Sequence, residues 1–538
     1  MLTRLRLIAL VSIVGASVVG APALTVPAAA QPAPKDTVLI AWRLGDTISA
    51  DPAESFEFTF GEINNNVYDK LMHFVPPDLE NLVPSLAESV AVSDDQLTYT
   101  FKTRKGVKFH SGNPFTAQDA AFSLQRAVIL DKTPAFILKQ FGFTAANVKE
   151  MVRATDDDTL VIRIANPVAP TFFLNCLTAN VASIVDMKLL LANEKAGDLG
   201  YDWLKTRSAG SGAFKLQTYR ALELIALERH DGYWRGAPQV RRVIFRHVAE
   251  SAAQRLLLEK GDIDIARNLG PDDIDALSTK PGVKVRNVLR GRLTYLSLNQ
   301  KVEALRKPEV HEAFKWLIDY EALEKSVMRN QGVTHQNFLP KGFLGAIEDR
   351  PYRQDLDKAR ALLKQAGLEG GFSAELIFQN GSPELELAQA IQASAAKVGI
   401  KLTVTPMDGR QLFPKYRARA HEIFMGRWGP DYPDPHTNAY TFAINPDNSD
   451  EAKQGGLLSW RNAWDIPEMT RMSRAALAER DGAKRAALYG EIQRLFLRTA
   501  PFAIMYQQVE PLGERDNVRG FDVGVKGADT FFTRLVKN

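Results

Sequence analysis

The chain has a single cysteine among its 538 residues, Cys176. It cannot form an internal disulfide, so stability has to come from hydrophobic cores. Cys176 lies in the apolar stretch TFFLNCL, which predicts a buried small hydrophobic side chain and argues against a nucleophile.

The chain also lacks a strong excess of charge of either sign. Its 67 Lys and Arg and 63 Asp and Glu give a formal net charge of +4, and no stretch is rich in Lys and Arg. A surface that binds nucleic acid normally carries a dense basic patch. We therefore expect no nucleic-acid partner.

Long apolar runs are missing except near the N-terminus, from Leu7 to about Val19. This run is shorter than the ~20 residues of a membrane-spanning helix. It follows Arg4 and Arg6 and precedes three alanines that suit a signal peptidase, so the pattern predicts a secretory signal peptide over residues 1–30. The predicted signal contains no cysteine. We expect a Gram-negative periplasmic protein that is not a lipoprotein.

Catalytic motifs are missing as well. Two His-Glu pairs begin the zinc-protease motif HExxH, but Lys315 and Met425 stand where its second histidine belongs. The phosphate-binding GxxxxGK[ST] and nucleophile-elbow GxSxG patterns are also absent. We expect no enzyme and no cofactor, and keep an exported hydrolase with an unrecognised site as the alternative.

What the chain does contain is a mixed α/β pattern. With 45% hydrophobic and 24% charged residues, it is large enough for two to four folded domains. Short apolar or alternating runs predict strands, and apolar residues at helical spacing predict helices. The clearest expected strands are 37–41, 97–101, 263–266, 375–378 and 400–404, and the clearest helices are 116–128, 251–260, 307–323, 384–398 and 488–496.

The stretch GRWGPDYPDPH, residues 426–436, concentrates two aromatic residues, two aspartates, three prolines and a histidine. Proline stiffens a loop, and Asp beside Pro is a common turn residue. From these residues alone, Asp431 and Asp434 either cap turns or belong to a binding site.

Sequence blocks spread over almost the whole mature chain occur together in one protein family, in the same order. They are ADPAES, NNNVYDKLMHF and PSLAESVAVSDDQLTYTFKTRKGVKFHSGNPFTAQDAAFSLQRA, then GSGAFKL, HDGYWRGAP and IFRHVAESAAQRLLLEKGDIDIA, and finally TYLSLNQ, KPEVHEAFKWLIDYEAL and KRAALYGEIQRLFLRTAPFAIMY. The chain resembles the family 5 extracellular solute-binding proteins of ABC importers, which include oligopeptide-, dipeptide- and nickel-binding proteins. Residues 428–435 match that family's W-x-x-D-Y-x-x-P segment.

The resemblance implies an α/β fold of the periplasmic-binding-protein type II kind, with two lobes and an additional domain beside lobe I. Lobe I would hold residues 31–72, 195–290 and 508–538, the additional domain 73–194 and lobe III 291–507. The chain would cross between the lobes near 293–298 and 504–507, forming a hinge. The implied function is that of a monomeric periplasmic binding protein that captures di- or oligopeptides and delivers them to the permease subunits of an ABC importer.

The family motif also implies roles for residues of the loop. A buried α-amino group needs a carboxylate partner, and by match Asp431 is that partner. Trp428 and Tyr432 would form walls beside it, and Asp434 is expected to be a structural turn residue.

One departure from the family concerns the other end of the ligand. Dipeptide-binding relatives place an arginine just after the strand that matches ELIF, where it holds the ligand's carboxylate, but this chain has QNGSPE, residues 379–384. Either Arg427 or Arg292 takes this role, or that end of the ligand lies in solvent, or the ligand is not a peptide. Arg43 is a further candidate for lining the cleft.

His436 keeps a second class of ligand open. Nickel-binding members carry a histidine near this loop, and imidazole suits nickel. No further His, Cys or carboxylate cluster stands at ligand spacing, so we expect no metal site, with His436 as a ligand only under a nickel or metal-chelate alternative. Opines and oligosaccharides are further alternatives on the same fold.

Overall fold

The structure is a computed structural model that describes residues 34–76, 78–526 and 529–538. The predicted signal peptide lies outside these residues. The described chain belongs to one compact unit that follows Pro32. Of its described helices, none combines the length and apolar character that crossing a bilayer requires.

The main sheet joins eleven strands of the described chain. Their order is β15-β14-β16-β12-β17-β11-β1-β10-β9-β8, with β13 paired to β17. The strands are β1 (Thr37–Trp42), β8 (Phe214–Arg220), β9 (Leu224–Arg229), β10 (Arg242–His247), β11 (Ile265–Ala266), β12 (Val283–Leu298), β13 (Gly332–Thr334), β14 (Phe372–Gln379), β15 (Ile400–Met407), β16 (Ile423–Trp428) and β17 (Phe502–Arg515).

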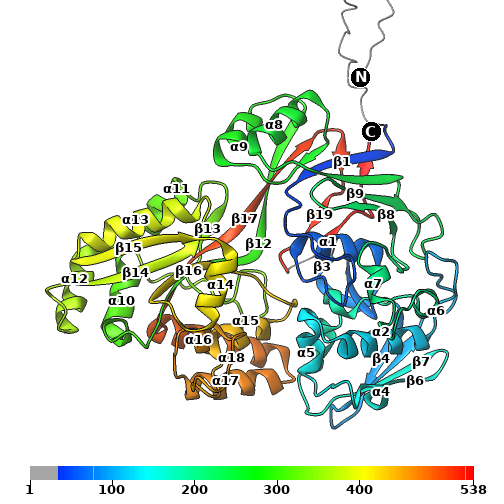
Figure 1. Cartoon of the computed structure of the whole chain (residues 1–538), viewed down its shortest axis with the longest axis horizontal. Helices are drawn as coiled ribbons and strands as arrows, with labels where there is room; N and C mark the ends of the chain where they lie inside the picture. The colour runs from blue at the N-terminus through cyan, green and yellow to red at the C-terminus, as the bar shows by residue number, and fades with distance from the viewer. Residues whose placement is uncertain (1–33, 77, 527–528) are drawn as a thin grey trace, which may run out of the picture. The chain divides into compact units, whose positions relative to one another are not determined.

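Two long strands, β12 and β17, connect the lobes at either end of this sheet (Figure 1). They pair antiparallel from Val283 opposite Arg515 to Ser297 opposite Phe502, with a break in register between Leu289 and Leu293 and a second irregularity between Thr294 and Tyr295. On one side of the break β17 meets β11 and the lobe I strands, and on the other β12 meets β16. These two strands contain both predicted crossings, and the fold is the expected two-lobe α/β type.

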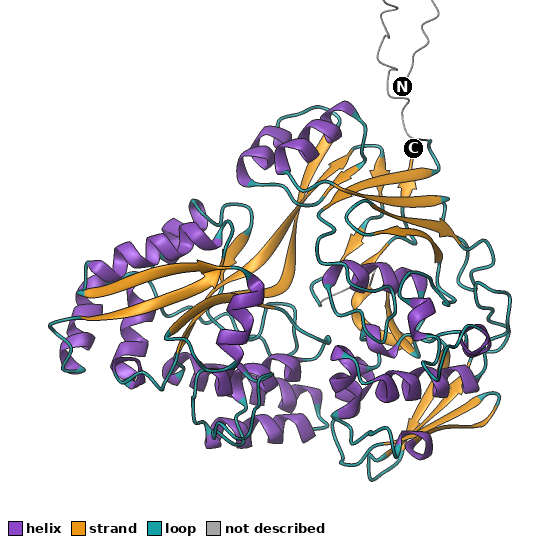
Figure 2. Cartoon of the chain, viewed as in Figure 1, coloured by secondary structure: helices purple, strands orange, loops and turns teal. Residues whose placement is uncertain are grey.

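Helices cover both lobes and fill the end of lobe III (Figure 2). They are α1 (Phe58–Val67), α2 (Ala117–Leu130), α3 (Phe136–Lys139), α4 (Val148–Met151), α5 (Pro170–Cys176), α6 (Met187–Ala192), α7 (Tyr201–Leu204), α8 (Ser251–Lys260), α9 (Pro271–Ser278), α10 (Pro308–Leu317), α11 (Tyr320–Lys325), α12 (Leu356–Gln365), α13 (Glu384–Ala396), α14 (Gly409–Arg417), α15 (Pro435–Ala443), α16 (Leu458–Arg461), α17 (Pro467–Ala478) and α18 (Gly482–Thr499).

Residues 73–194, the predicted additional domain, contain a separate antiparallel sheet in the order β4-β5-β7-β6. Thr116 starts α2 with a capping box that it shares with Asp119, as the predicted threonine cap requires. The helix packs on the sheet around a core that includes Phe173 and the buried, unpaired Cys176. The remaining strands of the chain are β2 (Met72–Val75), β3 (Asp78–Pro84), β4 (Ala87–Val92), β5 (Thr98–Thr103), β6 (Val152–Asp156), β7 (Thr159–Arg163), β18 (Val518–Arg519), β19 (Asp522–Val523), β20 (Thr530–Phe531) and β21 (Val536–Lys537).

The expected helix over 307–323 is two helices. The first, α10, ends at Leu317, because Ile318 adopts an extended backbone with ψ 129°. The side chain of Asp319 then accepts a hydrogen bond from the backbone N–H of Ala322 and starts α11. Apolar spacing alone predicts one continuous helix, because Ile318 continues the buried face.

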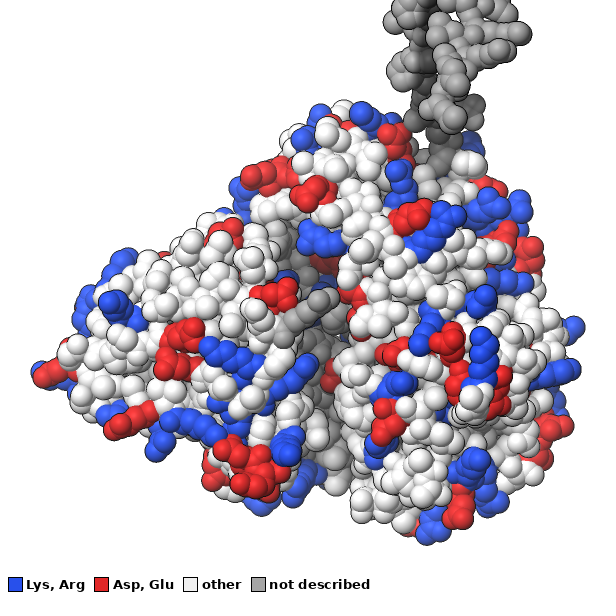
Figure 3. Space-filling view, viewed as in Figure 1, with Lys and Arg blue, Asp and Glu red and all other residues white. Residues whose placement is uncertain are grey.

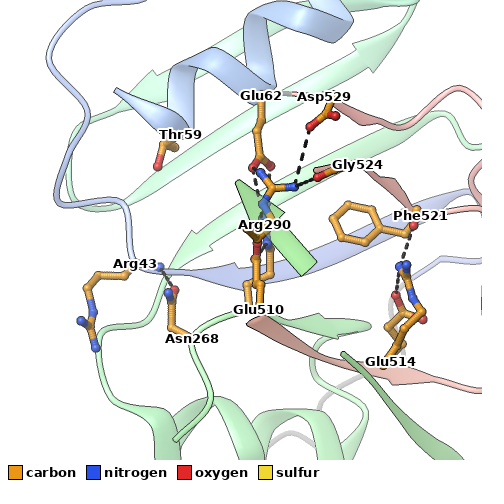
Figure 4. Close-up of polar contacts among 12 residues, drawn as sticks. Arg43, Thr59, Glu62, Asn268, Arg290, Glu510, Glu514, Phe521, Gly524 and Asp529 are labelled. Carbon is orange, nitrogen blue, oxygen red and sulfur yellow. Dashed lines mark hydrogen bonds and ion pairs between the residues drawn. The ribbon is translucent and has the colours of Figure 1, made fainter. Parts of the chain in front are cut away.

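Buried charges tie α1 to the two crossing strands (Figure 4). Glu62 of α1 forms ion pairs with Arg267 at 2.6 Å and with Arg290 of β12 at 3.0 Å. Glu510 of β17 lies 2.6 Å from Arg267 and 3.5 Å from Arg290. Burial opposes the charged form of Glu62, but the two guanidinium groups outweigh it and hold the pKa of Glu62 below its ordinary value.

We predict that Glu62→Gln lowers the free energy of unfolding by about 3–5 kcal/mol, because two buried arginines lose a shared counter-charge. Urea denaturation at pH 7 measures this change. Glu321→Gln, at an exposed position of α11, serves as the matched control and should change stability by less than about 0.5 kcal/mol. A loss below about 1 kcal/mol for Glu62→Gln would contradict the assigned role of the network.

Candidate functional site

The loop after β16 is held from behind by a buried ion pair. Asp434 accepts the backbone N–H of His436 and so caps α15, which begins at Pro435. Its carboxylate also accepts hydrogen bonds from Arg485 of α18 at 2.8 and 2.7 Å. Asp434 is therefore structural, as expected, and it fixes the position of the loop that carries Asp431.

This loop borders a cavity of about 690 Å³, a size that suits a small-molecule ligand. The space-filling view shows the surface hollowed between the two lobes (Figure 3). Aromatic side chains from both lobes line the cavity, with charged groups between them. The lining residues used below are Phe58, Asn65, Lys70, Phe136, Tyr416, Arg417, Arg427, Trp428, Asp431, Tyr432 and Arg461.

Asp431 presents its carboxylate to this cavity without a counter-charge. Its backbone N–H donates to Thr437 Oγ1 over 3.1 Å, but no ion pair or hydrogen bond of its carboxylate occurs within the described residues. Burial raises the pKa of Asp431 to about 7, and the nearby Arg461 opposes this shift only in part. A positively charged group that enters the cavity could therefore form an ion pair with the Asp431 carboxylate.

Trp428 and Tyr432, which flank Asp431 in the sequence, both line the cavity. The Trp428 ring packs edge-on against Phe442, with ring centres 5.6 Å apart. Tyr432 packs edge-on against Phe172 of α5 at 5.7 Å. The loop thus touches the additional domain, and the aromatic residues can form walls around a ligand as the motif suggests.

The three arginines singled out in the sequence lie in different settings. Arg427 lines the cavity, but its guanidinium pairs with Glu384 at 2.7 Å. Glu384 is the last residue of the QNGSPE segment, so this segment supplies an acidic partner to Arg427.

Arg292 and Arg43 lie outside the lining of this cavity. The Arg292 guanidinium lies 3.2 Å from the ring centre of Phe58, and no carboxylate pairs with it in the described part of the chain. Burial and the neighbouring Arg290 lower the pKa of Arg292 to about 9. Arg43 is exposed and donates to the carbonyl oxygen of Ala249 over 3.0 Å. Arg43 is not among the residues that line this cavity, and its place in the ligand cleft stays a prediction.

His436 is buried behind the loop. Its ring packs against Phe172 at 5.2 Å, and its Nδ1 lies 3.3 Å from the Tyr489 hydroxyl. Burial lowers the pKa of His436 to about 4, so the imidazole is neutral at pH 7. Residues 34–76, 78–526 and 529–538 contain no group of three or more His, Cys, Asp or Glu side chains placed to hold a metal ion.

Several cavity residues were not identified from the sequence. Lys70 and Phe136 come from lobe I and the additional domain, and Tyr416 and Arg461 from helices of lobe III. Their residue types are common at surfaces and in cores, so only the fold reveals that they meet. Lys70 lies within the block NNNVYDKLMHF, but nothing in that block signals a buried lysine.

Comparisons with known proteins agree with this architecture. A family model for bacterial extracellular solute-binding proteins, family 5, matches residues 81–450. The chain is 28% identical over 498 residues to the probable D,D-dipeptide-binding periplasmic protein DdpA of Escherichia coli K12, covering 91% of this chain and 92% of that protein. It is also 28% identical over 487 residues to the dipeptide-binding protein of the same strain, covering 86% and 88%.

A solved structure shows the same fold. It is the periplasmic binding protein DppA from Helicobacter pylori in complex with the peptide STSA, with a TM-score of 0.76 and 25% identity. The match covers 93% of this chain and 98% of that one.

The raised pKa of Asp431 predicts a pH-dependent stability cost in the unliganded protein. Between about pH 4 and pH 7 the folded protein keeps a proton on Asp431 that the unfolded chain has released, so this residue lowers stability as pH rises. Asp431→Asn should raise the free energy of unfolding by about 1–3 kcal/mol at pH 8 and by less than half of that at pH 5. Urea denaturation at both pH values measures the difference. The same substitution at the exposed Asp516 is the control, and an effect of Asp431→Asn that does not grow with pH would contradict the assigned environment.

Proposed function

The chain belongs to the family 5 bacterial extracellular solute-binding proteins, the substrate-binding components of ABC importers, and from that membership we propose that its ligand is a short peptide with a free α-amino group. Such a protein is a binding component and not an enzyme, and its partners are the ligand and the membrane permease subunits. We propose that it works in the periplasm as a monomer. The lobe and domain boundaries predicted from the sequence are part of this proposal.

The observation that carries the proposal is the unmatched carboxylate of Asp431 in the cavity between the lobes. A charged amine is costly to bury unless it meets an opposite charge, and a carboxylate supplies a strong charge-assisted hydrogen bond. Trp428 and Tyr432 would enclose the first residue of the ligand, since both line the cavity together with Asp431. The name of DdpA, the name of the dipeptide-binding protein and the STSA complex support a peptide as the ligand class.

Ligand capture on this fold follows from the shared strands. Because β12 and β17 pass through both lobes, closure requires bending near the break in register at Leu289 to Leu293. A ligand favours the closed arrangement only if it makes contacts there that the open arrangement lacks. The permease subunits would then recognise the closed, loaded protein.

We predict that free-amine di- to pentapeptides raise the melting temperature of the protein by several degrees at saturating concentration, because they bind only the folded state. The same peptides with an acetylated N-terminus should give little or no shift. Asp431→Asn should remove most of the shift for free-amine peptides, while Asp516→Asn keeps it. Equal shifts for acetylated and free peptides would overturn the amine-anchor role. If nickel chelates, opines or oligosaccharides raise the melting temperature and peptides do not, the ligand belongs to that other class.

Peptide affinity should also depend on pH. The α-amino group is protonated below about pH 8, but Asp431 must lose its proton to pair with it. Because the pKa of Asp431 in the free protein is about 7, affinity should fall by up to about tenfold for each pH unit below 7. Isothermal titration calorimetry between pH 5 and pH 8 measures this slope. In Asp431→Asn the fall in affinity below pH 7 should be absent, and an equal fall in the variant would assign the titration to another group.

A further inference from the structure

Lys70 is a buried lysine in the lobe I wall of the cavity. It lies between α1 and β2, and only 1% of its surface is exposed. Both Lys70 and Asn65 line the cavity, and Lys70 Nζ donates a hydrogen bond to Asn65 Oδ1 over 2.7 Å. An ammonium group has three protons to donate, so one neutral amide leaves its charge without a counter-ion.

The acidic neighbour of Lys70 does not supply that counter-ion through an ion pair. Asp69 accepts hydrogen bonds from the hydroxyls of Ser211 and Tyr233, at 2.8 and 3.1 Å, and from the indole N–H of Trp234 at 3.1 Å. These neutral donors occupy its carboxylate. Across the described ranges of the chain, no acidic side chain forms an ion pair with Lys70.

The Lys70 ammonium is therefore a buried cation that has no anionic partner in an ion pair within the described residues. Burial lowers the pKa of Lys70 to about 7, and the charge of Asp69 offsets this only in part. A carboxylate placed beside the ammonium would remove the cost of burying it and form a charge-assisted hydrogen bond.

The backbone that carries Lys70 is held in place by a close approach of two segments. At Gly210 a Cβ atom would fall 2.0 Å from the carbonyl oxygen of Val67, the last residue of α1. Only glycine fits there, so the 208–213 segment packs directly against the end of α1. Lys70 lies three residues after Val67, so this close packing also fixes the position of its backbone.

We propose that Lys70 binds the carboxylate of the ligand whose amino group pairs with Asp431. This inference rests on the proposed function and adds what determines specificity at the far end of the ligand. Lys70 comes from lobe I and Asp431 from lobe III, so a zwitterionic ligand that reaches both groups would connect the lobes and stabilise their closed arrangement.

Four arginines in or near the cavity fit this role less well. Arg427 is paired with Glu384, and Arg292 is not among the lining residues. Arg461 acts on Asp431, so it lies at the amine end of the cavity. Arg417 is exposed at the end of α14, where solvent weakens its pull on an anion.

The test uses di- to pentapeptides of alanine in two forms, with a free C-terminus and with a C-terminal amide. We expect the wild-type protein to bind the free acids about ten- to a hundredfold more tightly than the amides by calorimetry, the range of a charge-assisted hydrogen bond. In Lys70→Met the ratio should fall to about one, because the acid form loses its partner. Lys325→Met, at an exposed lysine of α11, should keep the wild-type ratio.

Each other outcome overturns the assignment. A ratio of about one in the wild type, or an unchanged ratio in Lys70→Met, would reject Lys70 while leaving peptide binding intact. Loss of the ratio in Arg417→Met with retention in Lys70→Met would move the carboxylate to α14. If no peptide binds in either form, the proposed function fails, and the role of Lys70 fails with it.

Discussion

The antiparallel pairing of β12 with β17 is the constraint on which the rest of the molecule depends. Each of these two strands contributes residues to both lobes, so the sheet of either lobe includes part of β12 and part of β17. The ion pairs of Glu62 and Glu510 with two arginines hold α1 against the lobe I side of this pair. Because those charges are fully matched and buried, they define a firm base, and the break after Leu289 is left as the place where the sheet can bend.

The buried charges beside the crossing strands have ion-pair partners, whereas two buried charges in the cavity have none among the described residues. At the base the Glu62 carboxylate meets two guanidinium groups, which hold its pKa below the ordinary value. In the cavity Asp431 and Lys70 have no ion-pair partner in the described chain, and burial moves both pKa values to about 7. Such groups lower the stability of the unliganded protein, and a bound ligand with charged groups can supply their ion-pair partners. A protein that must prefer its loaded state gains from this arrangement.

Much of the fold could be predicted from the sequence, because local chemistry determines it. The Thr116 capping box, the strand-helix-strand pattern of β14, α13 and β15, and the late helix α18 all appear where residue spacing places them. The error at Ile318 arose because an apolar stripe continues across a helix end that only the Asp319 side chain reveals.

The site was less predictable, because it depends on contacts between distant segments. The family motif pointed to Asp431, whose position follows from a loop with its own cap and prolines. The pairing of Arg427 with Glu384 joins β16 to α13, and no spacing rule connects the two. Lys70 and Asp431 are separated by most of the chain, so their presence in one cavity could be learned only from the structure.

The contact between α5 and the loop after β16 gives the single cysteine an experimental use. Asn175 of α5 donates to Asp434 over 3.3 Å, and the charges of Asp434 and Arg485 act on the thiol of Cys176 next to it. Cys176 is fully buried while this contact is made. An unaltered protein thus carries one thiol, free of competing cysteines, beside the surface where the additional domain meets lobe III. Because Cys176 shares a buried core with Tyr432 of this loop, the rate at which a thiol reagent reaches it reports openings of that core.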